Sequence, residues 1–247
     1  MIIEDFGTLS NGKECKLYTL QTPALDLSVT DYGTTLVNLI IKDGAKRTDI
    51  VLGFTNAKDY ETKNDPCFGC NVGRNANRIK NGKFTLNNVA YSLDQNDGKN
   101  NLHSGNNPYF KRIWNVETYD DNHITFSLNS PNMDQGFPGE IKVFVTYKII
   151  NNNSFEIIFE GIPKEDTIIN ITNHSYFNLN GEGSGSVLDH SVQIFADYYT
   201  PANRESIPLG TVESVKNTPM DFTSPKKIGL EIENDFQQLI YGKGYDH

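Results

Sequence analysis

The sequence predicts an all-β protein, either a β-sandwich or a curled antiparallel sheet. Short segments of alternating or wholly apolar residues recur along the 247 residues, with Pro, Gly, Asn and Asp between them. Many strands at short, regular spacing are typical of these architectures. Long helical periodicity is absent, and only Thr55 to Tyr60 resembles a helical turn. Because no change in composition marks a linker, we expect a single domain over residues 1–247.

The predicted strands follow one another from residue 16 onward and are bounded by turn-forming residues. The first four form a meander, and the later ones repeat at similar intervals. In order, we expect strands at Lys16–Thr22, Leu25–Thr30, Thr35–Lys42, Asp49–Gly53, Trp114–Tyr119, His123–Asn129, Ile141–Ile150, Ser154–Gly161 and Ser191–Ala196.

Asparagine-rich turns connect several of these strands. The pair Asn81-Gly82 is a strong signal for a tight hairpin. A second pair, Asn87-Asn88, turns the chain into Val89–Leu93, and 151–153 links two later strands as a hairpin. Residues 94–107 form a polar loop. Polar loops on a rigid β scaffold often contain binding groups.

The segment Ile168–Leu179, IINITNHSYFNL, predicts a strand with two different faces. The polar face suggests a groove lined with hydrogen-bonding groups. A half-exposed surface strand with His174 as a polar spacer is the alternative that this stretch leaves open. One face contains Ile169, Ile171, Asn173, Ser175, Phe177 and Leu179; the other contains Ile168, Asn170, Thr172, His174, Tyr176 and Asn178.

Composition excludes several classes of partner. The formal net charge of −9 argues against nucleic acid and anionic membranes, which need clustered Lys and Arg. The start Met-Ile-Ile-Glu-Asp does not resemble a signal peptide, and no stretch is long enough to span a bilayer. We therefore expect a cytoplasmic protein. The oligomeric state is not predicted.

Three cysteines, an odd number, fit a reducing compartment better than a disulfide framework. Cys67 and Cys70 form one CxxC pair. A structural zinc site needs four ligands, and Cys15 has no nearby partner motif. A thioredoxin-like site needs a βαβ context that the sequence lacks. We interpret the pair as two small residues in a buried turn before Asn71.

A set of polar residues suits a neutral, polyhydroxylated ligand. Arginine offers a rigid fork of donors, asparagine both donates and accepts, and a carboxylate accepts from two hydroxyls. Histidines add proton transfer near neutral pH. Each residue also has a structural alternative: an ion pair for the arginine, loop filling for His103, and a solvated terminal charge for Asp246. The set is Asn77, Arg78, His103, His174, Tyr176 and Asp246.

Seven ordered blocks resemble the signature blocks of the aldose 1-epimerase (galactose mutarotase) family, and they extend over essentially the whole chain. No nucleophile elbow, phosphate loop or HExxH motif competes with this assignment. The blocks are Gly73–Ile79, Asn101–Gly105, Gly136–Gly139, Asn173–Leu179, Ala196–Pro201, Pro219–Phe222 and Gly244–His247.

The resemblance implies an antiparallel β-supersandwich, incomplete at its C-terminus, with a sugar cleft on the concave face. The implied reaction interconverts the α and β anomers of free hexoses such as galactose and glucose, without a cofactor. His174 matches the family's general acid, and Tyr176 lies beside it. Asn77, Arg78, His103 and Asp246 match sugar-contacting positions. The family's general base, a glutamate, is expected beyond residue 247.

Two smaller departures from the family's blocks are Ser104, where glycine is usual, and Gln135. Two alternative functions stay open. One is a noncatalytic carbohydrate-binding module of the same fold. The other is an epimerase of hexose 6-phosphates, although this acidic chain lacks an obvious basic cluster. The preferred sugar is not predicted.

Overall fold

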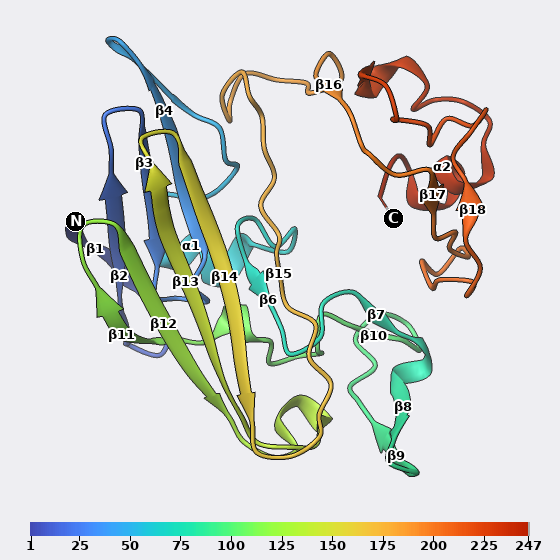
Figure 1. Cartoon of the computed structure of the whole chain (residues 1–247). Coiled ribbons are helices and arrows are strands. Elements are labelled where there is room, and N and C mark those ends of the chain that lie inside the picture. The colour runs from blue at the N-terminus through green and yellow to red at the C-terminus, as the bar shows by residue number, and fades with distance from the viewer. Residues whose placement is uncertain (247) are drawn as a thin grey trace. The chain divides into compact units, whose positions relative to one another are not determined.

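A computed structural model describes residues 1–246 of the chain (Figure 1). His247, the last residue of the seventh block, lies outside the described residues. The chain divides into two compact units, Met1–Gly183 and Ser184–His247. The predicted all-β class is confirmed, because antiparallel strands dominate and the helices are short. Among the described residues, no helix is both long and apolar enough to cross a membrane.

The first sheet is an antiparallel meander, which confirms three of the four strands expected in this part. The strand predicted at Asp49–Gly53 is wrong, because the last strand of the sheet ends at Asp49. The carboxylate of Asp49 accepts hydrogen bonds from the backbone N–H groups of Leu39 and Val51, which turns the chain out of the ladder. The strands are β1 (Ile2–Thr8), β2 (Glu14–Gln21), β3 (Leu25–Thr30), β4 (Leu36–Asp43) and β5 (Lys46–Asp49).

The second sheet is also an antiparallel meander, and all four of its predicted strands are present. Its last two strands are joined by the predicted asparagine hairpin at 151–153. The strands are β11 (Asn115–Tyr119), β12 (His123–Ser130), β13 (Ile141–Asn151) and β14 (Ser154–Pro163).

The two sheets of the first unit face each other (Figure 1), and their largest apolar cluster contains residues of both. Leu27 and Val29 of β3 are fully buried in the same cluster as Phe126 of β12 and Val145 of β13. Alternate residues along each strand point inward, as the period of a β-strand requires. The first unit is therefore a β-sandwich.

Short elements connect the sheets. The helix α1 (Ala57–Lys63) begins at Asn56, whose side chain accepts from the backbone N–H of Asp59, and it confirms the expected helical turn. The others are β6 (Asn71–Val72), β7 (Arg78–Ile79), β8 (Lys83–Leu86), β9 (Val89–Ser92), β10 (Asn101–Leu102), β15 (Thr172–Asn173) and 3-10 turns at Lys80–Gly82, Tyr109–Lys111 and Asp134–Gly136.

The hairpin predicted at Asn81-Gly82 is wrong, although the turn itself forms. Both residues have positive φ, and the N–H of Lys83 donates to the carbonyl of Lys80. The flanking strands nevertheless diverge: β7 pairs with β10, and β8 pairs with β9 through Asn87-Asn88. The second asparagine pair is thus the hairpin turn, as predicted.

The long strand predicted at Ile168–Leu179 is also wrong. Only β15 is regular, and it pairs with β6, while Asn170 and Phe177 make isolated bridges elsewhere. The segment changes its partner along its length, so it presents no continuous face to one sheet. Phe177 and Leu179 of the predicted apolar face are 47% and 64% exposed. Asn178, from the predicted polar face, is buried.

The second unit is mostly irregular. The strand predicted at Ser191–Ala196 is shortened to two residues. This unit contains β16 (Ser191–Val192), β17 (Tyr198–Tyr199), β18 (Glu213–Ser214), β19 (Lys226–Lys227), a 3-10 turn at Ile228–Leu230 and α2 (Gln237–Gly242); β16 pairs with β19 and β17 with β18.

Candidate functional site

His174 follows directly after β15, and its backbone is fixed by β6 and the turn before it. Its N–H donates to the carbonyl of Cys70 at 2.7 Å. The side chain of the preceding Asn173 donates to Asn71 at 3.0 Å and to the carbonyl of Gly69 at 3.1 Å. Asn173, which the sequence pattern placed on the face opposite His174, therefore helps to hold the histidine in place.

His103 follows β10 and is held by two reciprocal hydrogen bonds with Asn77. The N–H of Asn77 donates to Nδ1 of His103 at 3.0 Å, and the N–H of His103 donates to the carbonyl of Asn77 at 3.2 Å. Both residues have positive φ, which asparagine and histidine adopt more readily than most residues. Because Nδ1 accepts, the neutral ring has its proton on Nε2 and donates through that atom.

The two imidazoles and Tyr176 form a cluster of rings. The ring centroids of His103 and His174 lie 5.5 Å apart in an edge-to-face arrangement. The rings of His174 and Tyr176 lie 5.2 Å apart, and Tyr176 also packs on Phe68 at 5.3 Å. Tyr176 is 42% exposed, so the cluster opens to the surface at this ring.

Arg78 lies beside this cluster and forms an ion pair. Its Nε donates to Oδ2 of Asp97 at 2.7 Å, and its own N–H donates to Oδ1 of Asn77 at 2.9 Å. The ion pair foreseen as an alternative for this arginine is present. It engages one of the five N–H donors of the guanidinium group, so it orients the side chain and is compatible with a second, hydroxyl partner.

Five of the six predicted site residues therefore come together in the first unit, from β7, the loop after β10 and the segment after β15. These are Asn77, Arg78, His103, His174 and Tyr176. The sixth, Asp246, is an exposed residue of the second unit, and its role stays a prediction. Among the described residues, no group of three or more His, Cys, Asp or Glu side chains is arranged to hold a metal ion.

Comparisons with known proteins decide the family. The family model described as aldose 1-epimerase matches residues 16–247. The chain belongs to the aldose 1-epimerase family. A galactose mutarotase of Sus scrofa is 38% identical over 244 residues, which cover 98% of this chain and 69% of the relative. An aldose 1-epimerase of Haemophilus influenzae is 37% identical over 239 residues, with 96% and 69% covered.

The fold agrees with this family. The crystal structure of a galactose 1-epimerase from Lactobacillus acidophilus superimposes with a TM-score of 0.87 at 28% identity. The match covers 98% of this chain and 71% of that one. Since it extends over both compact units, the irregular second unit as well as the sandwich follows the architecture of an aldose 1-epimerase.

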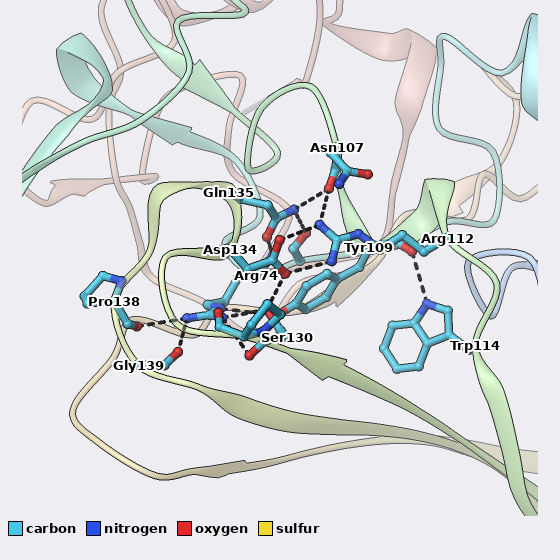
Figure 2. A network of polar contacts seen from close by, with 12 residues as sticks. Arg74, Asn107, Tyr109, Arg112, Trp114, Ser130, Asp134, Gln135, Pro138 and Gly139 are labelled. Atoms are coloured by element: carbon cyan, nitrogen blue, oxygen red, sulfur yellow. Dashed lines mark hydrogen bonds and ion pairs between the residues drawn. The ribbon is translucent and has the colours of Figure 1, made fainter.

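Three residues before Asn77, this aldose 1-epimerase family member has a buried arginine that the sequence interpretation missed (Figure 2). Arg74 is fully buried, and its guanidinium group donates to the hydroxyls of Tyr109 and Ser130 and to the carbonyls of Pro138 and Gly139. A buried arginine needs such complete pairing, because an unpaired buried charge is costly.

Gln135 extends the Arg74 network toward both site loops (Figure 2). Its side chain donates to the carbonyls of Gly73 and Asn107, at 3.2 and 3.0 Å, and accepts from the N–H of Arg74. Gly73 lies a few residues before Asn77, and Asn107 a few residues after His103. The network therefore fixes both segments to the turn around Asp134. Gln135, which departs from the family's usual residue, makes the hydrogen bonds that connect them.

The site residues that were not predicted differ in how clearly the sequence indicates them. Asp97 lies in the polar loop predicted to contain binding groups, so a search for a partner of Arg78 would have found it. Arg74 lies inside a quoted block, but arginine is mostly exposed in proteins and its burial depends on distant carbonyls. The bond from His174 to the carbonyl of Cys70 joins two backbone groups, so no residue type in the sequence indicates it.

Proposed function

We propose that this chain interconverts the α and β anomers of a free aldohexose, such as galactose or glucose, by acid–base ring opening. The observation that supports this most directly is the edge-to-face pair of His103 and His174, beside the exposed ring of Tyr176. Two imidazoles next to an open aromatic face offer proton donors near neutral pH to a sugar that stacks there.

In this proposal His174 protonates the ring oxygen while a base removes the proton of the C1 hydroxyl. The bond between C1 and the ring oxygen breaks, and the product is the open-chain aldehyde. Rotation about the C1–C2 bond followed by closure gives either anomer, and both protons return. By resemblance the base in this family is a glutamate, and we assign this role to no residue of the present sequence.

The remaining residues bind and orient the sugar. His103 donates through Nε2, since its Nδ1 already accepts from Asn77. Arg78, held by Asp97, and Asn77 present further polar groups beside it, and we assign Asp246 a contact with a sugar hydroxyl. We also propose a single domain over residues 1–247, which the family match over residues 16–247 supports. Three free cysteines support a location in the reducing cytoplasm.

The test is His174→Asn in the natural polypeptide that contains residues 1–247. Anomer exchange of galactose is followed by magnetisation-transfer NMR, and sugar binding by line broadening of the sugar signals. We expect the turnover rate to fall about 10²- to 10⁴-fold, since a positioned acid contributes that much. Binding should change far less, because the acid acts mainly in the transition state.

His123→Asn is the matched control. This histidine lies on β12 and interacts with Thr118 and Asp120 rather than with the site cluster. It should leave exchange unchanged. Unaltered exchange in His174→Asn would refute the assigned acid. Sugar binding without any exchange in the unmodified protein would instead favour a noncatalytic carbohydrate-binding module.

A further inference from the structure

Cys67 and Cys70 lie at the two ends of a tight turn. The N–H of Cys70 donates to the carbonyl of Cys67 at 3.2 Å, and Gly69 between them has a φ of +67°. A four-residue turn of this kind brings its end Cα atoms within about 7 Å, and disulfide bonds span about 4.4–6.8 Å between Cα atoms. The side-chain amide of Asn64 donates to Sγ of Cys70 at 3.3 Å, and the thiol of Cys67 donates to the carbonyl of Asp65 at 3.8 Å. The predicted buried turn is confirmed, and its backbone geometry brings the two cysteines to a separation that a disulfide bond can span.

The two thiols of this turn differ in reactivity. Cys67 follows the exposed residues Asp65 and Pro66 and is 8% exposed, whereas Cys70 is 1% exposed. The neighbouring thiol of Cys70 and the charge of Lys111 lower the pKa of Cys67 despite its burial. Burial raises the pKa of Cys70. Cys67 is therefore the thiol that ionises first, and Cys70 lies three residues away in the same turn.

The same turn contacts the candidate site directly. The carbonyl of Cys70 accepts from the N–H of His174 at 2.7 Å. Phe68, between the two cysteines, packs edge-to-face on Tyr176 at 5.3 Å. In Figure 1, the strand β6 that follows the turn lies beside β15, as their pairing requires. A change in the turn thus reaches His174 and Tyr176 through one hydrogen bond and one ring contact.

We propose that Cys67 and Cys70 form a peroxide-reactive dithiol whose oxidation is transmitted to His174 and Tyr176. The thiolate of Cys67 attacks hydrogen peroxide, the O–O bond breaks, and the leaving hydroxide takes up a proton to become water. The sulfenic acid on Cys67 is then attacked by the sulfur of Cys70. The S–O bond breaks, and the hydroxyl leaves as water with the thiol proton.

In total, two thiols and one peroxide give one disulfide and two waters, and the sulfurs lose the two electrons that the peroxide gains. This chemistry is independent of the proposed function. Only its consequence for sugar turnover rests on that function. Cys15 provides an internal reference, because it is fully buried in the first sheet and burial raises the pKa of its thiol to about 12.

The chemical test uses the full chain, treated with peroxide, labelled with a maleimide in denaturant and digested with trypsin. Cleavage after Lys63 and Arg74 places both turn cysteines in the peptide Asn64–Arg74, and Cys15 falls in Glu14–Lys16. We expect Asn64–Arg74 to lose two hydrogens and to take up no label. It should react at least about tenfold faster than Glu14–Lys16, since the thiolate is the reactive form.

Matched variants identify the order of events. Cys70→Ser should stop at a sulfenic acid on Cys67 that a cyclic diketone captures, and Cys67→Ser should leave Cys70 as a thiol. The proposal is overturned if the peptide Asn64–Arg74 still takes up two maleimide labels after peroxide has oxidised Cys15. It is also overturned if Cys67→Ser loses its Cys70 thiol as fast as the unmodified protein. The unmodified chain decides the first outcome without any variant.

Transmission to the site is tested separately by the ¹H–¹⁵N NMR signal of the His174 amide. We expect this signal to shift on oxidation of the unmodified protein and to return on reduction with dithiothreitol. Cys67→Ser should show no such shift. If the disulfide forms and the His174 amide signal does not shift, the proposed coupling between the cysteine turn and His174 is overturned. None of these measurements uses a sugar, so their failure is distinct from a failure of the proposed function.

Discussion

At the residue scale, the candidate site depends on reciprocal hydrogen bonds between two short segments. Asn77 and His103 form one such pair, and Asn75 and Ser104 form the next. The N–H of Asn75 donates to Oγ of Ser104 at 2.7 Å, and this hydroxyl donates back to the carbonyl of Asn75 at 3.1 Å. Ser104 has a φ of +69°, where glycine is the usual choice. Its hydroxyl offsets the cost of that conformation.

Ser104→Ala should lower the free energy of unfolding by about 1–3 kcal/mol, because the buried N–H of Asn75 loses its acceptor. Both residues are buried, and Ser104 is fully so. Urea unfolding followed by circular dichroism measures the change. Ser104→Gly loses the same hydrogen bonds but relieves the positive φ, so it should be less destabilising. Equal stability of Ser104→Ala and the unmodified chain would show that the hydroxyl has no such role.

At the element scale, the sequence predicts strands well where one face of a segment meets one sheet. All four strands of the second sheet were foreseen, because their residues alternate against a common core. Ile168–Leu179 shows the same alternation but pairs successively with different short segments. Periodicity describes the chain alone, so it cannot reveal a change of partner.

The site shows the same limit of prediction. Asn77, Arg78, His103 and His174 were predicted from their chemistry and their positions in blocks similar to those of a family. The grouping of His103 with His174 follows from β7–β10 and β6–β15 pairings, each only two residues long. Segments this short leave no periodic signal. Likewise, the burial of Arg74 depends on carbonyls more than 50 positions away in the chain.

The hairpin between β8 and β9 provides a prediction at this scale. Asn87 and Asn88 both have positive φ, at 50° and 61°, which is the geometry of a type I′ turn. Asn87 also donates to the carboxylate of Asp166, so the exposed Asn88 is the residue to change. Asn88→Gly should keep or raise the free energy of unfolding, by at most about 1 kcal/mol.

Asn88→Val should lower the free energy of unfolding by about 1 kcal/mol or more, since a β-branched residue is strained at positive φ. Thermal unfolding of both variants checks the pair. A valine variant as stable as the glycine variant would contradict the turn geometry.

At the scale of the whole molecule, the buried carboxyl group of Asp31 and the partly buried one of Asp134 give opposite contributions to pH dependence. Burial alone would raise the pKa of Asp134, but hydrogen bonds from Arg112 and Ser130 outweigh it and hold the pKa below its usual value. Its stabilisation is present above the carboxyl's unfolded pKa and is lost as pH falls through the folded value. Asp31 behaves in the opposite way, because burial raises its pKa to about 6.

Between pH 3.8, the usual pKa of this carboxyl group, and about pH 6, the folded state keeps a proton on Asp31 that the unfolded chain has released. Stability contributed by this group therefore falls as pH rises through that window and stays low at pH 7. Asp31→Asn removes the ionisation and retains an oxygen that accepts from the N–H of Lys16, a bond of 3.0 Å. We expect this variant to be more stable at pH 7 by about 1–3 kcal/mol.

The gain from Asp31→Asn should shrink toward zero below about pH 4, where the aspartate of the folded protein is protonated as well. Urea unfolding at a series of pH values measures both curves. Asp134→Asn is the matched control, and it should lose stability at pH 7 because Arg112 keeps its charge without a charged partner. A loss of stability in Asp31→Asn at pH 7 would mean that the charged carboxylate is the form the fold prefers. The polar contacts of Asp31 with Lys16 and Thr30 would then outweigh its burial.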